Sequence, residues 1–321
     1  MKTLNKNIML TVLLAVFQLA GMSAYAGFNC SRGEYKVKLE NGYRQDRSDY
    51  QFEDLDKNNF ANTGYTSGWS SIKRISIYQL GGSLEWKDEC SRLYARVRGH
   101  YGWILHGKAQ GFPLNWNVNG HTNDVAFRVG YMFDVCNCFT FVPVIGYGTS
   151  YIKTKLKNQP NCSQVFGPNA YSNHSGDRTT SRYHAPFIGF DLRFSNCFCC
   201  RKVDFLFGYD FHYGNLRVKK SPRRFVLTDD INTSNYGYKI NAHNVVTNRF
   251  RLSATTNITA CIDLGLDFEY SMRYNTCKNR VHLQRNDEIV ATGQFTPSQF
   301  HVSNRLCSNS FLINLMLGYN F

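Results

Sequence analysis

Apolar and polar residues alternate along this chain in segments of about ten residues. The last segment is the most regular. Large apolar side chains occupy every second position there, at Phe311, Ile313, Leu315, Leu317, Tyr319 and Phe321. Asn314, Gly318 and Asn320 lie on the other face. A period of two is typical of a β-strand with one apolar and one polar face, so the pattern predicts a strand here.

A second segment, Cys261 to Tyr274, combines an apolar face with a charged one. Six large apolar residues, from Ile262 to Met272, alternate with residues that include Asp263, Asp267 and Glu269. An antiparallel sheet with both faces covered would have to bury these charges. Eight more segments show similar alternation: Tyr35 to Glu40, Ile75 to Trp86, Leu93 to Trp103, Val125 to Phe133, Phe139 to Tyr151, Phe187 to Phe194, Val203 to Tyr213 and Asn248 to Thr256.

The connections between these segments alternate between short and long. Short ones lie at Lys87 to Cys90, Asp134 to Cys138, Ser195 to Lys202 and Asn257 to Ala260. Long ones lie at Tyr43 to Ser71, Ile104 to Asn123, Lys153 to Arg182, Val218 to Val245 and Asn275 to Ser303. Outer-membrane barrels have short periplasmic turns and long outer loops. We therefore predict an all-β, transmembrane antiparallel barrel of ten strands over residues 27–321. Eight or twelve strands are alternatives, because the segments near Phe225 and Val281 could form hairpins.

The first 26 residues have the features of a secretory signal peptide. Lys2 and Lys6 precede an apolar stretch from Ile8 to Leu19, and Ala24 and Ala26 are the small residues that a signal peptidase recognises. The apolar stretch is shorter than the roughly 20 residues of a membrane-spanning helix. We expect cleavage after Ala26, export, and integral insertion into a bacterial outer membrane.

Composition supports a membrane barrel, and charge suggests its partners. The chain is 15% aromatic, with 25 Gly and seven Pro. Its net charge of +14 becomes +12 once the two signal-peptide lysines are removed (14 − 2). A basic chain can bind nucleic acid, but an exported chain meets anionic membrane surfaces and solutes instead. We expect outer-membrane lipid and lipopolysaccharide as partners, and neither nucleic acid nor a cofactor.

Eleven cysteines in an exported chain indicate an oxidising compartment and disulfides. The predicted strands place eight of them at the periplasmic end: Cys30, Cys90, Cys136, Cys138, Cys197, Cys199, Cys200 and Cys261. A disulfide within a hairpin that a short turn already closes adds little stability. Bonds to neighbouring envelope proteins are therefore one prediction, and bonds between adjacent turns are the alternative. The one-residue spacing of Cys136 and Cys138 is too short for a common zinc site, so we expect no metal.

Several of these features together resemble a known family. The segment Asp134-Val135-Cys136-Asn137-Cys138 and the ending Leu317-Gly318-Tyr319-Asn320-Phe321, with its terminal Phe, are similar to those of the cysteine-rich major outer membrane proteins of chlamydia-like and Legionella-type bacteria. The resemblance implies a pore-forming protein that becomes cross-linked through disulfides. The ten strands expected here are fewer than in the chlamydial porins.

The polar faces of the strands supply a predicted lumen. Its residues carry both signs: Arg96, Arg98, His100, Arg128, Asp191, Arg193, Asp204, Asp210, His212, Arg249, Arg251, Asp267, Glu269 and Arg273. About eight strands leave an interior that side chains just fill, whereas 16 to 18 leave an aqueous channel. Ten strands therefore give a narrow lumen. It is either plugged by ion pairs or open as a small selective pore.

Two other functions compete with a pore. The first is an omptin-like protease, because Asp210-Phe211-His212 faces inward and Asp54-Leu55-Asp56 lies in the first outer loop. No further omptin-like sequence surrounds these motifs, so we do not expect an enzyme. The second is a surface adhesin, since an outer loop carries the basic cluster Lys219, Lys220, Arg223 and Arg224.

Side-chain type also predicts one register. In the hairpin from Asn248 to Tyr270, a slip of one residue would turn every side chain to the wrong face. Centring the turn on Thr259 places Leu252 opposite Leu266, Arg251 opposite Asp267 and Arg249 opposite Glu269. We predict that these two charged pairs form inside the barrel.

Overall fold

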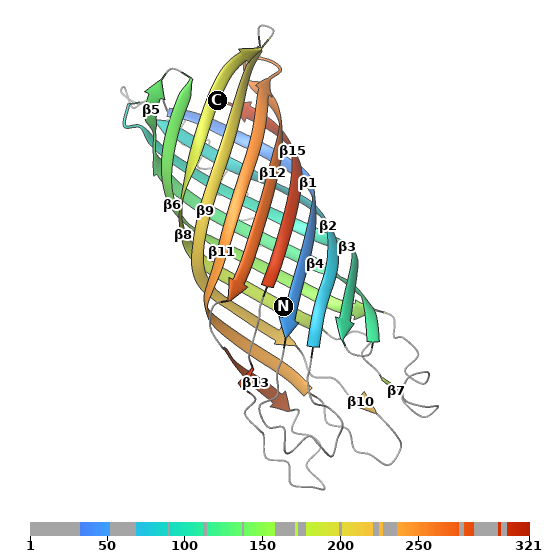
Figure 1. Cartoon of the computed structure of the whole chain (residues 1–321). Coiled ribbons are helices and arrows are strands. Elements are labelled where there is room, and N and C mark those ends of the chain that lie inside the picture. The colour runs from blue at the N-terminus through green and yellow to red at the C-terminus, as the bar shows by residue number, and fades with distance from the viewer. Residues whose placement is uncertain are drawn as a thin grey trace, which may run out of the picture.

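The chain folds as one closed antiparallel β-barrel (Figure 1). The computed structural model describes residues 33–51, 69–88, 90–111, 114–136, 138–157, 171–172, 178–198, 201–220, 225–226, 236–275, 279–285, 301–302 and 307–321. The wall of the barrel is built from β1 (Gly33–Gln51), β2 (Trp69–Asp88), β3 (Leu93–Gly111), β4 (Leu114–Tyr131), β6 (Phe139–Lys157), β8 (Arg178–Phe198), β9 (Arg201–Lys220), β11 (Tyr236–Asn257), β12 (Ile262–Asn275) and β15 (Cys307–Asn320).

Pairing between the first and last strands closes the ring. β1 pairs with β2 on one side and with β15 on the other, and β12 joins β15 to β11. The short β5 (Phe133–Cys136) continues the wall after β4 and pairs with the start of β6. The prediction of ten antiparallel strands is confirmed, because each predicted segment coincides with one strand of the ring.

Four short strands lie outside the ring. β7 (Tyr171–Ser172) pairs with β10 (Phe225–Val226), while β13 (Asn279–Arg285) pairs with β11 and with β14 (His301–Val302). The segments near Phe225 and Val281 do contain strands, but these do not increase the number of strands in the wall. The described residues contain no helix that is long and apolar enough to cross a membrane. The predicted signal peptide, residues 1–26, lies outside the described residues.

The strands extend further toward the long loops than the alternation predicted. The predicted long connection from Ile104 to Asn123 is wrong, because β3 continues to Gly111 and β4 begins at Leu114, opposite it. Alternation was lost from the sequence there because a bulge between Ile104 and Lys108 shifts the faces of β3.

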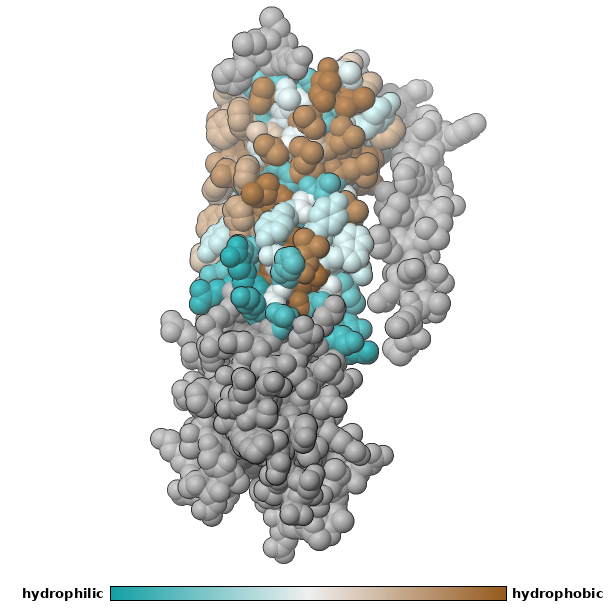
Figure 2. Space-filling view, turned by 90° about the vertical axis from the view of Figure 1, so that its right-hand side faces the viewer, coloured by the Kyte–Doolittle hydropathy of each residue, from teal (hydrophilic) through white to brown (hydrophobic). Residues whose placement is uncertain are grey.

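Apolar side chains cover the outside of the wall. Leu39, Ile145 and Ile188 are each more than 60% exposed, and Leu252, Leu315 and Leu317 share the outer face with them. Figure 2 shows hydrophobic side chains gathered over the end of the barrel that carries the short turns. An apolar outer wall around a polar interior is the arrangement of an outer-membrane barrel, in which the outer face contacts lipid.

The predicted register of the β11–β12 hairpin is wrong by two residues. Leu252 lies opposite Phe268, Arg251 opposite Glu269 and Ser253 opposite Asp267. The turn contains four residues, 258–261, and the Thr259 hydroxyl accepts hydrogen bonds from the backbone N–H groups of Cys261 and Ile262. This cap moves the centre of the turn from Thr259 to the next residue. A shift of two keeps every side chain on its predicted face.

Candidate functional site

Charged side chains from many strands meet inside the barrel, and Glu40 on β1 is the centre of the first cluster. Its carboxylate lies 2.6 Å from Arg98 Nη2, 3.3 Å from Arg96 Nη2 and 2.7 Å from His100 Nε2. The Ser83 hydroxyl donates a further hydrogen bond of 3.1 Å. The Glu40 side chain is fully buried, so these contacts replace the water that it loses.

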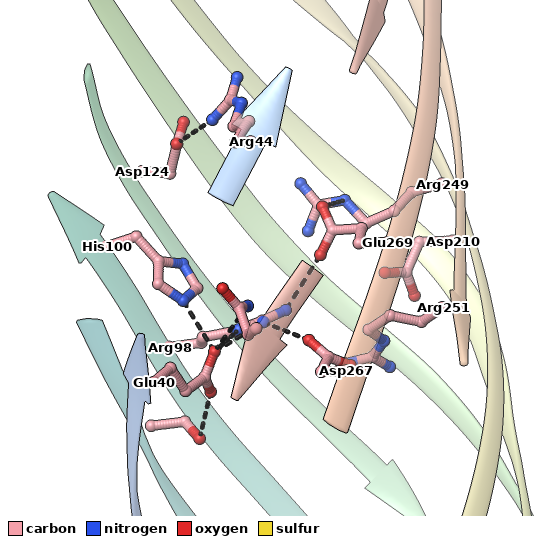
Figure 3. A network of polar contacts seen from close by, with 12 residues as sticks. Glu40, Arg44, Arg98, His100, Asp124, Asp210, Arg249, Arg251, Asp267 and Glu269 are labelled. Atoms are coloured by element: carbon pink, nitrogen blue, oxygen red, sulfur yellow. Dashed lines mark hydrogen bonds and ion pairs between the residues drawn. The ribbon is translucent and has the colours of Figure 1, made fainter. Parts of the chain in front are cut away.

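Arg98 carries this cluster across the lumen. Its guanidinium also binds Asp267, and its Nη1 lies 3.0 Å from Glu269 Oε2 (Figure 3). Arg98 belongs to β3 and both acids to β12, and three strands of the ring lie between these two in the shorter direction. A contact between such distant strands can only pass through the interior. Arg98 therefore joins Glu40 on β1 to two carboxylates on β12, across the interior from its own strand.

A second cluster surrounds Asp191 on β8. Arg128 on β4 donates to Asp191 Oδ1 at 3.1 Å and to Asp210 Oδ2 at 2.6 Å. Arg251 on β11 donates to the same Asp191 oxygen at 2.7 Å. Asp191 is completely buried between these two guanidinium groups. The predicted pair of Arg251 with Asp267 does not form, because Arg251 binds Asp191 and Asp267 binds Arg98.

Further ion pairs lie nearer the two ends. Toward the short turns, Arg193 on β8 lies 3.1 Å from Glu85 on β2 and over the Tyr94 ring at 4.4 Å. Toward the long loops, Arg44 on β1 binds Asp124 on β4. Arg249 Nε lies 3.2 Å from Glu269 Oε1, so this predicted pair forms as a diagonal contact. Ion pairs are thus distributed along the length of the barrel and are not confined to one level.

The lumen also contains a small cavity toward the long loops. This cavity is lined by Ile75, Thr154, Leu216 and Arg273 and has a volume of about 30 Å³. The ion pairs around Glu40 and Asp191 lie nearer the short turns than this cavity does.

The structure places all fourteen predicted lumen residues on inward-facing positions of the wall. Nine are buried and form part of the contacts above or lie beside them: Arg96, Arg98, His100, Arg128, Asp191, Asp210, His212, Arg251 and Asp267. Arg193, Arg249, Glu269 and Arg273 are half-buried. Asp204 is separate from the network, because it lies near the short turns and accepts a hydrogen bond from Ser195 at 2.6 Å.

The sequence prediction missed several interior charges, chiefly Glu40, Arg44, Glu85 and Asp124. Glu40 alternates with Leu39 and Asn41, so the period of two could have identified it. Arg44 was assigned to a long loop and Asp124 fell between a loop ending at Asn123 and a strand beginning at Val125, because the lengths of β1 and β4 were underestimated. Gln79 and Asn314, which share a buried hydrogen bond of 3.0 Å, were also missed.

The Asp210-Phe211-His212 motif is part of the interior packing. Asp210 is bound to Arg128, and the His212 ring lies 4.6 Å from the Phe187 ring. Its two nitrogens have no hydrogen-bond partner among the described residues. The other half of the omptin-like pattern, Asp54 to Asp56, lies outside the described residues. Within the described part of the chain, no three His, Cys, Asp or Glu side chains converge as metal ligands do.

Six of the cysteines lie within the described residues, at the ends of the wall strands. Cys90, Cys136, Cys138 and Cys261 are exposed in the short turns, and Cys307 is at the opposite end of the wall. Cys197 lies near the end of β8, while Cys30, Cys199 and Cys200 lie outside the described residues. The sulfurs of Cys136 and Cys138 are 3.2 Å apart. The hydrogen bond from Cys138 lowers the pKa of the Cys136 thiol, and the same contact raises the pKa of Cys138.

The predicted basic outer loop is described only at its start. Lys219 points outward near the end of β9, and Lys220 is the last residue of that strand. Arg223 and Arg224 lie outside the described residues.

Comparison with known proteins gives a family and a fold. A family model described as "Pom: Protochlamydia outer membrane protein" matches residues 38–321. No curated protein matches the chain. Among solved structures, the outer membrane protease OmpT of Escherichia coli is similar with a TM-score of 0.60 and 10% identity, over 90% of this chain and 97% of that one. The transport unit of the autotransporter AIDA-I from Escherichia coli has a TM-score of 0.40 and 10% identity, with 92% of each chain covered.

Proposed function

We propose that this chain, which belongs to the Protochlamydia outer membrane protein family, forms a narrow pore gated by ion pairs inside its barrel. The observation that carries the proposal is Arg98, which joins Glu40, Asp267 and Glu269 across the lumen. Small ions and small hydrophilic solutes are the cargo that such a lumen would admit. The family and the barrel fold establish an outer-membrane protein, and the pore is the step beyond them.

The chemistry of the interior supports a gate rather than a permanent seal. Replacing a buried ion pair by apolar residues of similar size is often neutral or stabilising. A barrel that only needed to stay closed would gain from an apolar core at the level of Arg98. Ion pairs can exchange partners and admit water, so a polar interior allows transient opening. This role is not enzymatic, in keeping with the binding of Asp210 to Arg128.

We expect a small unitary conductance when the purified barrel is inserted into planar lipid bilayers. The steps should be well below those of barrels with 16 to 18 strands, because ten strands enclose a narrow lumen. Protein that was heat-denatured before addition is the control and should give no steps. Silent bilayers in which gel analysis shows inserted, folded barrel would contradict the pore.

A second role, as a disulfide-linked component of the envelope, is favoured by Cys136 and Cys138. Both thiols are exposed in one turn, and the lowered pKa of Cys136 increases its thiolate fraction near neutral pH. The Cys136 thiolate would attack a disulfide of a neighbouring protein. A mixed disulfide then forms, and one cysteine of that protein leaves as a thiolate. No external oxidant is required for this exchange.

The dithiol makes a specific prediction about reactivity. At pH 7, a thiol-alkylating reagent should modify Cys136 several-fold faster in the unaltered protein than in the Cys138→Ser variant. The substitution removes the thiol that favours the Cys136 thiolate. Mass spectrometry of peptides at short reaction times measures both rates, with Cys261→Ser as the control in another short turn. Equal rates in all three proteins would show that the pair is not activated.

A further inference from the structure

Beyond the pore, the outer wall carries a band of basic side chains that the proposed function does not use. We call it the basic belt. It consists of outward-facing residues near the loop ends of β2, β3, β6, β8 and β9, namely Arg74, His106, Lys108, Lys153, Lys155, Arg178, Arg182, Arg217 and Lys219. Figure 2 shows hydrophilic side chains in this part of the described wall, below the hydrophobic zone. The outward-facing residues described at these strand ends include no Asp or Glu.

Aromatic rings lie directly beneath the belt and mark a membrane boundary. The Tyr101 ring lies 4.9 Å from the Trp103 ring and 5.8 Å from the His121 ring, and His121 lies 6.0 Å from Tyr151. Tyr and Trp are enriched where a barrel wall meets the lipid headgroups. Since Lys153 follows Tyr151 toward the loops, the basic belt lies at or just beyond the headgroups on the loop side.

Positive charges in the belt face each other directly. Arg182 on β8 is the register partner of Arg217 on β9, and Lys155 on β6 is the partner of Arg178 on β8. The Arg182 guanidinium lies 5.5 Å from the Tyr151 ring, in a cation–π contact. Like charges that are directly opposed destabilise a sheet. An anion bound between Arg182 and Arg217 would remove this cost.

The wall is also hollowed at the belt. A groove of about 540 Å³ lies over β2, β3 and β4, beside the bulge between Ile104 and Lys108. Basic and amide side chains line it, among them Arg74, His106, Lys108 and Asn117. These groups donate hydrogen bonds, so the groove suits a ligand that is rich in acceptor oxygens.

We propose that the basic belt binds the phosphate groups of lipopolysaccharide, the phosphorylated glycolipid of the outer leaflet. Guanidinium groups bind phosphate oxygens in pairs, and such charge-assisted hydrogen bonds are about twice as strong as neutral ones. The acyl chains of the glycolipid then lie along the apolar wall near Ile145 and Ile188. In this arrangement the negative charge of the glycolipid matches the basic belt, and its phosphates and acyl chains lie at the membrane depths of the belt and of the apolar wall. It rests on the outer-membrane location and does not depend on an open pore.

The test compares lipids that differ only in phosphate. Purified barrel in detergent micelles is titrated with diphosphoryl lipid A or with the same lipid after both phosphates are removed, and native mass spectrometry counts bound lipid. We expect the phosphorylated form to bind at least about tenfold more tightly, and added salt to reduce the difference because it screens exposed charges. Equal binding of the two lipids by the unaltered protein would overturn the proposal without any variant.

Matched double variants locate the site. Arg182→Gln with Arg217→Gln should reduce lipid A binding about tenfold or more. Arg92→Gln with Lys202→Gln removes two exposed charges at the short-turn end and should leave binding unchanged. Heat-modifiable migration on gels shows that each variant is folded. Equal binding by both variants would overturn the assignment to the belt, and full displacement of lipid A by millimolar inorganic phosphate would overturn the glycolipid as occupant.

Discussion

Replacing Arg98 by methionine should lower the free energy of unfolding by about 3 to 5 kcal/mol, the cost of removing one partner from a buried ion pair. Glu40, Asp267 and Glu269 would lose a shared counter-charge inside the barrel. Urea unfolding of the micelle-bound barrel, followed by tryptophan fluorescence, measures the change. Arg92→Met, in an exposed turn, is the control and should have little effect.

The same variant should also increase unitary conductance in planar bilayers. Methionine leaves the acids without the guanidinium that holds them across the lumen, so water and cations can enter. Adding Glu40→Gln and Asp267→Asn to Arg98→Met should recover part of the stability, because fewer negative charges remain unneutralised. Unchanged stability and conductance in Arg98→Met would show that the network neither supports the barrel nor limits the pore.

Replacing Gly120 by alanine should destabilise the barrel by about 3 kcal/mol, from backbone strain together with overpacking. Gly120 has a φ of +151°, which side chains rarely permit, and it lies opposite Ile104 at the bulge of β3. A methyl group there would also overlap the backbone carbonyl of Lys153 on β6. Urea unfolding measures the loss, and the β3–β4 ends should show faster amide hydrogen exchange.

Gly99→Ala provides a matched control on the neighbouring strand. A methyl group at Gly99 would meet its nearest atom, the Asp124 backbone oxygen, at 3.8 Å, which is an ordinary contact. The free energy of unfolding of Gly99→Ala should stay within about 0.5 kcal/mol of that of the unaltered protein. If the two alanine variants lose equal stability, the strain at Gly120 is not what limits substitution there.

The sequence alone determined the class of fold and, within the segments it predicted as strands, which face is polar. Alternation between, for example, Leu266, Asp267, Phe268 and Glu269 has a period of two, and this period assigns a face without any knowledge of partners. The outer-membrane barrel, its ten strands and the inward positions of Arg98 and Asp191 followed from it. Of the basic belt, only Lys219 was singled out from the sequence, as part of a basic outer loop, and most of the other members lay in segments predicted as long loops.

Only the tertiary structure decided which charges meet. Arg251 was expected to bind Asp267 on the next strand, but it binds Asp191 on β8, and Asp267 binds Arg98 on β3. Pairing in a closed barrel depends on curvature, strand tilt and register together, because side chains from non-neighbouring strands converge in the lumen. A local turn, capped by the Thr259 hydroxyl, shifted the register by two residues. Alternation is a property of each strand, whereas these contacts are properties of the closed ring.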